Sequence, residues 1–451
     1  MKKYFFKKGI NGEKKIGHGV KLISSLLNFK EVLIKRFVFF ISSVFLLILF
    51  SSLSFAREKE IPEAVFSPSQ ECGKCHINIH QAWSNSMHAK AIEDPVFKLD
   101  YLHALNEYGE KVREYCLSCH SPTTRYTGDT YLKNRISREG INCDFCHSIY
   151  AVDLENPKDP FKVNPGSTQY GPYQNASSPA HLSTYSELHT RSEFCAGCHQ
   201  LKNNFGVLVL GTYSEWREGP YPEQKVHCQN CHMPKVPGMP IVDAKVKKSE
   251  LNMTAHEFLG GHSEINLQHA ATLRTQFEVK KSKALVTVFV TNAESGHKLP
   301  TGTPVRKVIL SVKLLDDKGK KIAEKEKVYQ KVLLDQKGDV LTESYKMILE
   351  ASSILSDNRI APKETRQEKF EFDLPPGIKP FSVESTLRYQ YPTPVLTAGL
   401  MEVEMAKQVV SLPLGKIFLI GFFSWLRVFI ILLFLFLILW MGYRMLKRRF
   451  L

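Results

Sequence analysis

The chain has 451 residues, with 60 Lys and Arg against 45 Asp and Glu, and its formal net charge is +15. Nearly all of the excess lies at the ends: residues 1–56 carry +8 and residues 413–451 carry +6, which leaves +1 on the 356 residues between them. A nearly neutral body offers no basic surface to a phosphate backbone, which argues against DNA or RNA binding. With 43% hydrophobic and 23% charged residues, the chain is neither disordered nor a polytopic membrane protein.

The N-terminal segment has the pattern of a secretory signal. A basic lead ends at Lys35 and Arg36, and residues 37–50 are apolar apart from two serines. Ser54 and Ala56 are the small residues that a signal peptidase requires, and charged residues follow from Arg57. We therefore predict that residues 1–56 are a signal peptide, with a retained N-terminal anchor as the alternative. The body would then lie on the periplasmic or extracytoplasmic side.

All ten cysteines of the chain belong to five CxxCH motifs. The motifs are Cys72–His76, Cys116–His120, Cys143–His147, Cys195–His199 and Cys228–His232. This spacing is that of c-type haem attachment. Two cysteines three residues apart lie on one side of a helical turn, where they can add to the two vinyl groups of one porphyrin, while the adjacent His reaches the iron.

Other chemistries of paired cysteines fit the pattern less well. Structural zinc sites do not need a His after each CxxC pair, and a thioredoxin-like site would have one motif on a βαβ unit. Disulfides stabilise little when they close such short loops. We predict five covalently bound haem c groups. Their thioether tethers would be Cys72, Cys75, Cys116, Cys119, Cys143, Cys146, Cys195, Cys198, Cys228 and Cys231, and their proximal iron ligands His76, His120, His147, His199 and His232.

Several stretches resemble the multihaem cytochrome c family that includes the tetrahaem cytochrome c-554 of ammonia oxidisers and, more remotely, hydroxylamine oxidoreductase. The stretches are 83–89 (WSNSMHA), 140–147 (GINCDFCH), 181–199, 228–234 (CQNCHMP) and 296–304 (GHKLPTGTP). The resemblance covers roughly residues 66–305. It implies a helix-rich scaffold with closely spaced haems, and a distal-ligand role for His88. The resemblance does not carry over a catalytic activity. This chain has five motifs, whereas the best-known members have four or eight.

Ten further histidines between residues 57 and 412 are candidates for the sixth iron positions. Methionine ligands are available, but bis-histidine ligation is our default, because methionine usually serves high-potential single-haem carriers. We assign distal roles to His88, His181, His256, His262 and His297, with His189 and His269 in reserve. His80 follows His76 by one helical turn and is interpreted as a hydrogen-bonding neighbour. His103 and His227 are interpreted as surface or propionate-binding residues.

The pattern changes to that of strands where the cysteines end. Alternating or β-branched segments occur at 285–290, 308–314, 327–333, 368–374 and 385–391, with turn sequences between them. We predict an antiparallel, immunoglobulin-like β-sandwich of six or seven strands over residues 276–412. The sandwich would be either a spacer or a docking surface, since it contains no paired carboxylates, nucleophile elbow or phosphate-binding glycine loop.

Two apolar runs, 417–426 and 428–443, lie near the C-terminus, interrupted by Arg427 and followed by a basic stretch. We predict a transmembrane helix and a basic cytoplasmic tail in residues 413–451. The alternative is a buried core helix. The expected fold class is thus α+β: a pentahaem domain at 57–275, the sandwich, and one membrane anchor that places the protein as a single-pass protein in the cell (inner) membrane.

These features together predict an electron-transfer cytochrome. It would carry electrons between a membrane-embedded redox protein and an extracytoplasmic one, with the membrane contacted through the C-terminal helix and no nucleic acid bound. The alternative is a multihaem oxidoreductase that acts on hydroxylamine, nitrite or tetrathionate at a haem with an open sixth site. We favour the carrier over the enzyme and assign no catalytic residue, because free histidines are abundant and no motif departs from CxxCH.

Overall fold

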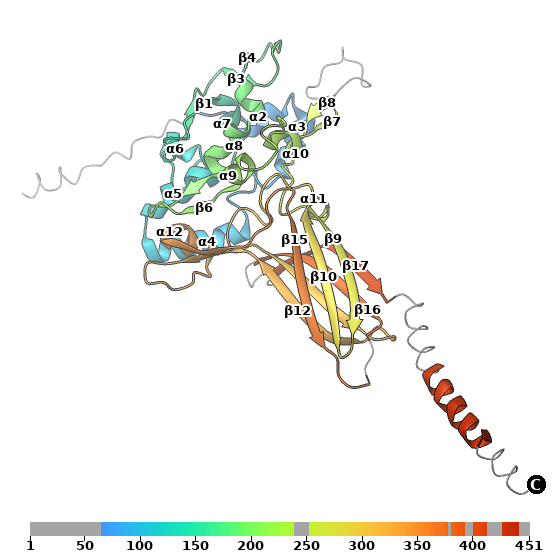
Figure 1. Ribbon diagram of the computed structural model, residues 1–451. Coiled ribbons are helices and arrows are strands. Elements are labelled where there is room, and N and C mark those ends of the chain that lie inside the picture. Colours follow the sequence, from blue (N-terminus) through green and yellow to red (C-terminus); the bar gives the residue numbers. More distant parts are fainter. Residues whose placement is uncertain (1–64, 239–251, 378–379, 393–399, 413–425, 442–451) are drawn as a thin grey trace, which may run out of the picture. The chain divides into compact units, whose positions relative to one another are not determined.

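The structure is a computed structural model that describes residues 65–238, 252–377, 380–392, 400–412 and 426–441 (Figure 1). The predicted signal peptide, residues 1–56, lies outside the described residues. The haem-motif region and the sheets belong to one compact unit, Glu63–Leu451.

The region that carries the CxxCH motifs is built from short helices and small two-stranded sheets. Its helices are α2 (Ser69–Gly73), α3 (Ile77–Ser84), α4 (Pro95–Tyr108), α5 (Lys111–His120), α6 (Thr124–Thr127), α7 (Cys143–Ser148), α8 (Ser192–His199), α9 (Thr212–Arg217), α10 (Cys228–His232) and α11 (Glu264–Ala270). The sheets pair β1 (Ile149–Val152) with β2 (Phe161–Val163), β3 (Thr168–Gly171) with β4 (Leu182–Tyr185), β5 (Leu201–Lys202) with β6 (Leu208–Leu210), and β7 (Lys235–Pro237) with β8 (Asn252–Thr254).

Four of the five motifs lie at the C-terminal ends of helices. Helices α5, α8 and α10 end at the motif histidine, and α7 ends one residue after it. The first motif lies across the junction of two helices, because Cys72 is in α2 and His76 is the N-cap of α3. Each helical turn places its two cysteines on one side, as attachment to one porphyrin requires.

Local sequence explains the ends of the longest helix in this region, α4. The Asp94 side chain accepts a hydrogen bond of 2.9 Å from the backbone N–H of Phe97, and Pro95 occupies the first turn. The helix stops at Gly109, whose φ of +73° lies in the region that favours glycine. Helix α4 lies beside α12 (Ser344–Glu350), an insertion from the sheet region (Figure 1).

The β-sandwich consists of a three-stranded and a four-stranded antiparallel sheet. The first has the order β15 (Thr365–Asp373), β10 (Lys283–Asn292), β9 (Ala271–Lys280). The second has the order β12 (Lys321–Tyr329), β11 (Lys307–Leu315), β16 (Ser382–Pro392), β17 (Leu400–Ser411), and a hairpin of β13 (Lys331–Leu334) and β14 (Ser353–Asp357) adjoins them. The first strand begins at Ala271, before the predicted boundary at 276.

The distribution of buried apolar side chains separates the two regions. The sandwich holds one large core, in which alternate residues of β10, such as Val286, Val288 and Val290, are 0–1% exposed. The motif region has only small clusters, for instance the one around Phe145 and Ile149. A region with so little apolar core needs another apolar component to stabilise it.

The C-terminal prediction is wrong. The described helix there covers residues 426–441, and no helix in the described part of the chain is long and apolar enough to cross a membrane. Sixteen residues span about 24 Å at about 1.5 Å per residue, which is shorter than the hydrocarbon core of about 30 Å. The transmembrane part of the predicted fold class is overturned, and so is the location as a single-pass membrane protein.

Candidate functional site

A cavity of about 3120 Å³ runs through the motif region. Pockets for ordinary small ligands have roughly 300–1,000 Å³, so this space could hold several large cofactors. Nine of the ten cysteines line it, and the remaining one, Cys75, is exposed. All five motif histidines line it as well.

The cysteines of different motifs approach one another. The sulfur atoms of Cys72 and Cys143, of Cys119 and Cys198, and of Cys195 and Cys228 lie close enough for each to shift the pKa of the other. These contacts link the first motif to the third, the second to the fourth, and the fourth to the fifth, so two of the three contacts join motifs that are not consecutive in the sequence.

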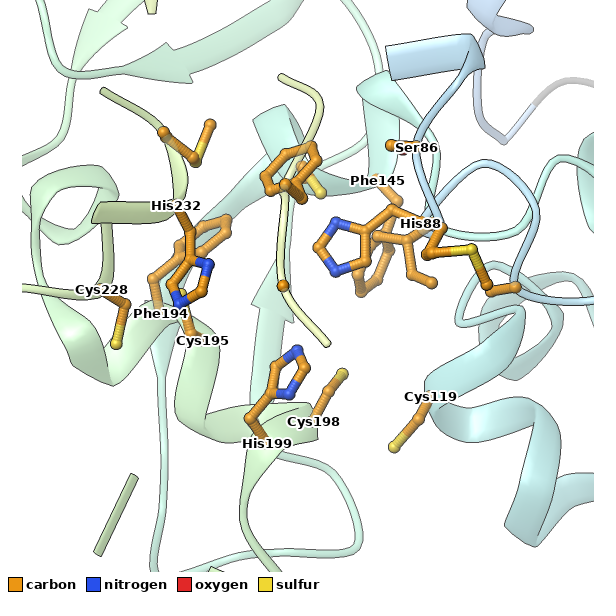
Figure 2. A pocket seen from close by; sticks show the side chains of 18 of the residues that line it. Ser86, His88, Cys119, Phe145, Phe194, Cys195, Cys198, His199, Cys228 and His232 are labelled. Carbon is orange, nitrogen blue, oxygen red and sulfur yellow. The ribbon is translucent and has the colours of Figure 1, made fainter. Parts of the chain in front are cut away.

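Three motif histidines each face a second histidine at nearly the same distance. The ring centres are 6.4 Å apart for His76 and His181, 6.2 Å for His199 and His88, and 6.4 Å for His232 and His297. The imidazoles of His88, His199 and His232 point into the same part of the cavity (Figure 2).

These distances fit two imidazoles on opposite sides of one iron. A metal–imidazole bond is about 2 Å long, and the ring centre lies roughly 1 Å beyond the ligating nitrogen, so the two ring centres should be roughly 6 Å apart. The donor set therefore fits haem iron, and the chemistry it would supply is reversible one-electron transfer.

Hydrogen bonds orient these histidines for metal binding. The Nδ1 atoms of six of them lie near backbone carbonyl oxygens: His120 near Ala91, His147 near Tyr170, His181 near Leu182, His232 near Leu259, His256 near Thr254 and His297 near Lys298, at 2.6–3.3 Å. A carbonyl oxygen can only accept, so Nδ1 carries the proton and Nε2 keeps its lone pair. This is the tautomer in which histidine binds a metal through Nε2.

Burial keeps these imidazoles neutral. Desolvation is the largest cause that lowers the pKa of His88 to about 3, and it lowers the pKa of His199, His256 and His297 to about 4. Neighbouring histidines lower each of these values further. A metal ligand must be unprotonated, so the electrostatics of the cavity agree with its hydrogen bonding.

Two histidines lie near His147. The ring of His189 is 5.6 Å from that of His147 and nearly parallel to it, while His256 lies close enough for His147 to lower its pKa. The Nε2 atom of His189 lies 3.3 Å from the carbonyl of Cys146, and its Nδ1 atom is buried without a partner. The Nδ1 atom of His256 lies 2.7 Å from the carbonyl of Thr254, so His256, unlike His189, has the same tautomer as the other candidate ligands.

His120 has different surroundings. Phe97 stacks on its ring with 3.8 Å between ring centres, and no histidine ring in the described residues is paired with it as in the three pairs above. His262 lines the same cavity, and the carboxylate of Asp94 acts on the pKa of both His120 and His262.

The remaining histidines are placed as follows. His80 packs beside Trp83 with ring centres 5.6 Å apart, and His103 is exposed against Tyr345. His227 caps α10, and its Nδ1 accepts a hydrogen bond from the backbone N–H of Ser192. His269 is exposed at the edge of the cavity.

The residues that orient the ligands could not be recognised from the sequence. The carbonyls of Ala91 and Leu259 come from loops and that of Tyr170 from β3, each more than twenty residues along the chain from the histidine it holds. Every residue has a carbonyl, so no residue type marks this role. The sequence signal that was available is the concentration of Gly and Pro around the histidines.

Comparison with known proteins agrees with this site. Residues 71–148 match the family model of cytochrome c554 and c-prime. A penta-heme cytochrome c552 from Thermochromatium tepidum shares the fold, with a TM-score of 0.61 and 22% identity over 77% of this chain and 99% of that one. The putative ApaA protein from Bordetella pertussis has a TM-score of 0.17 and 14% identity over 32% of this chain and 92% of that one, and carries no argument. No curated protein matches the sequence significantly.

The motifs, the family match and the fold define one class: the chain is a multihaem c-type cytochrome, and its cofactor is covalently bound haem c. The resemblance to the cytochrome c-554 group is thereby confirmed. Electron transfer or another redox activity follows from that class.

Proposed function

We propose that this protein is an electron carrier with five haems, one on each CxxCH motif. The observation that carries the proposal is the set of three histidine pairs with ring centres 6.2–6.4 Å apart. In each pair one ring belongs to a motif and the other comes from a distant segment. Two histidines on each iron leave no open position, which suits electron transfer rather than substrate binding.

The ligand pairs follow from these neighbours. His181 serves the haem of His76, His88 that of His199, and His297 that of His232. His256 serves the haem of His147, supported by the contact of its Nδ1 atom with the carbonyl of Thr254, which puts the lone pair on Nε2. His262 serves the haem of His120, supported by their common neighbour Asp94.

The thiol contacts suggest the order in which electrons move. The first and third haems are neighbours through Cys72 and Cys143. Cys146 acts on the pKa of both Cys195 and Cys198, which brings the third haem close to the fourth. The fourth neighbours both the second and the fifth. The fourth haem, that of His199, is then a branch point. One branch leads through the third haem to the first, and the other two lead to the second and to the fifth.

The exposure of the motif cysteines indicates through which two haems electrons enter and leave the protein. Cys75 of the first motif and Cys231 of the fifth are exposed, whereas the other eight cysteines are half-buried. A partner can approach a haem edge most closely where its tether reaches the surface. Electrons would therefore enter and leave at the first and fifth haems.

The partner would be another redox protein with a basic surface. The body of the chain, residues 57–412, has a net charge of only +1, and each haem adds two propionates, so the loaded body is acidic. Acidic surfaces attract basic partners and increase the rate of encounter. Salt should therefore slow the transfer of electrons to such a partner.

Intact mass spectrometry and carbon monoxide binding test the proposal. The mass of the purified protein should exceed that of the chain by five haems, and denaturation should release none, because thioethers are covalent. Two or three haems would contradict the count.

The reduced protein should not bind carbon monoxide. Binding by one haem would favour the second candidate function, an oxidoreductase that acts on a small nitrogen or sulfur compound. The haem of His120 is the place for it, because no histidine ring of the described residues lies about 6 Å from that ring, as in the three pairs.

A further inference from the structure

Arg306 is a cation in the haem cavity with no described counter-ion. Its Nη1 atom donates a 3.2 Å hydrogen bond to the carbonyl of Thr301, and its guanidinium lies 5.2 Å from the ring centre of Tyr391. Its Nε atom is buried without a hydrogen-bond partner, and the described residues offer no carboxylate within ion-pair distance of it. Arg306 is half-buried, but its Nε atom is buried without an acceptor, which is costly for a charged group, so this arrangement suggests that an anion binds there.

Tyr389 on β16 presents a second unpartnered polar group at the same place. Its side chain is 3% exposed, and its hydroxyl group is buried without a hydrogen-bond partner. Tyr389 and Arg306 both line the haem cavity. A buried hydroxyl without a partner costs about 1–3 kcal/mol, which makes an additional hydrogen-bonding group in the cavity favourable.

Two glycines leave room for these groups. A Cβ atom at Gly261 would lie 2.9 Å from the hydroxyl oxygen of Tyr389 and 3.2 Å from Nη1 of Arg306. A Cβ atom at Gly302, whose φ is +84°, would lie 2.9 Å from the same Nη1 atom. The hydroxyl and the guanidinium therefore face a common point, and no side chain on either glycine blocks them.

The charge of Arg306 also reaches the histidines of the cavity. After burial, it is the largest cause that lowers the pKa of His262, and it contributes to the lowered pKa of His199 and His297. Acidic neighbours are present as well: Asp94 acts on His262, and Asp94 and Asp100 act on Tyr391. None of them forms an ion pair with Arg306 in the described residues.

We propose that Arg306 and Tyr389 together bind the propionate carboxylate of a haem in the part of the cavity between His199, His262 and His297. The guanidinium supplies the positive charge and the tyrosine hydroxyl supplies one hydrogen bond. The proposal rests on the proposed function, because it requires haem in this cavity. It assigns to the sandwich a second contact with the cofactors, from β16, beside the His297 loop.

The test is a redox titration of the Arg306→Gln, Arg306→Lys and Tyr389→Phe proteins. A nearby cation stabilises the reduced haem, and its loss leaves the propionate charge unbalanced. Arg306→Gln should therefore lower the midpoint potential of one haem and leave the haem content unchanged. Arg306→Lys should restore most of that potential, and Tyr389→Phe should cause a smaller shift in the same direction. The matched control is Arg388→Gln, because Arg388 pairs with Glu326 and Glu402.

A free oxyanion is the other source of the same chemistry, and sodium nitrite and sodium sulfite serve as its probes. The wild-type midpoint potentials should not respond to either salt beyond the effect of ionic strength. A saturable response of the wild type that Arg306→Gln abolishes would overturn the propionate assignment. Unchanged potentials in both Arg306→Gln and Tyr389→Phe, with the full haem content, would also overturn it. A low haem content of the wild type would instead refute the proposed function.

Discussion

At the scale of single residues, His297 tests whether the sandwich supplies an iron ligand. His297→Ala should leave all haems attached, because each haem is held by the thioether bonds of its CxxCH cysteines. One low-spin haem should become high-spin and bind carbon monoxide, since the ring 6.4 Å from His232 is lost. Electron paramagnetic resonance and carbon monoxide titration measure both changes. His269→Ala is the control, and an unchanged spectrum of His297→Ala would exclude this ligand.

The choice between His256 and His189 follows from their hydrogen bonds. His256 has its Nδ1 atom near the carbonyl of Thr254, whereas His189 has its Nε2 atom near that of Cys146. His256→Ala should therefore create a high-spin haem, and His189→Ala should not. The same spectra decide between them. If only the His189 variant became high-spin, the ligand of the His147 haem would have to be reassigned.

Lys331 should make stability depend on pH. Its ammonium group donates to the carbonyls of Leu208 and Val209, and burial, the largest cause, lowers its pKa to about 8. Between pH 8 and the ordinary value near 10.4, the unfolded chain binds more protons than the folded protein, so folding becomes more favourable as pH rises. Urea unfolding at pH 7 and pH 10 should show an increase of up to a few kcal/mol. The increase should vanish in Lys331→Met, and an equal increase in that variant would assign it to other groups.

At the scale of elements, a buried ion pair joins α9 to the sandwich. Arg359 and Glu215 are each 5% exposed, with 2.7 Å between Nη1 and Oε1. Arg359 also donates to the carbonyl of Pro300, and the Thr301 hydroxyl donates to Glu215 over 2.6 Å. These bonds hold the loop that begins at His297. The sandwich is thus fastened to the motif region beside one of its proposed ligands.

Breaking this pair should weaken the whole protein. Arg359→Met leaves the carboxylate of Glu215 buried without its partner, which costs about 3–5 kcal/mol. Denaturant titration of the haem-loaded protein measures the loss. The double variant Glu215→Gln with Arg359→Met should recover part of it, because residue 215 is then neutral and Asp357, the other partner of Arg359, keeps its ion pair with Lys298. A loss below about 1 kcal/mol would indicate that water reaches the pair.

At the scale of the whole molecule, the two regions should differ in their need for haem. The motif region has only small apolar clusters, whereas the sandwich has a continuous core that includes Val286, Val308 and Leu387. Protein made without haem attachment should therefore keep the sandwich folded and lose the motif region. Limited proteolysis and mass spectrometry should yield a protected fragment that starts near Ala271. Equal protection of both regions would show that haem is not needed for the fold.

Much of this architecture could be predicted from local sequence. The predicted strands 285–290 and 308–314 fall within β10 and β11. Burial alternates along β10, whereas β11 is buried over most of its length, and the residue pattern records both. Strand β9 begins at Ala271, five residues before the predicted start of the sandwich, and it buries the polar residue Thr275, so residue type alone does not mark this strand. The membrane prediction rested on apolar composition, whereas no helix of the described residues is long and apolar enough to cross a membrane.

The sequence by itself was enough to predict which residues attach haem, because thioether attachment needs two cysteines and a histidine within five residues, and such a spacing is visible along the chain. Only the tertiary structure decided which histidines face one another. His88 lies 111 residues before His199, and His297 lies 65 residues after His232, yet the rings in each pair are about as far apart as two ligands of one iron. The pairing of ligands depends on distances between segments that folding brings together. Because every candidate ligand is a histidine, residue type does not show which two belong to one iron.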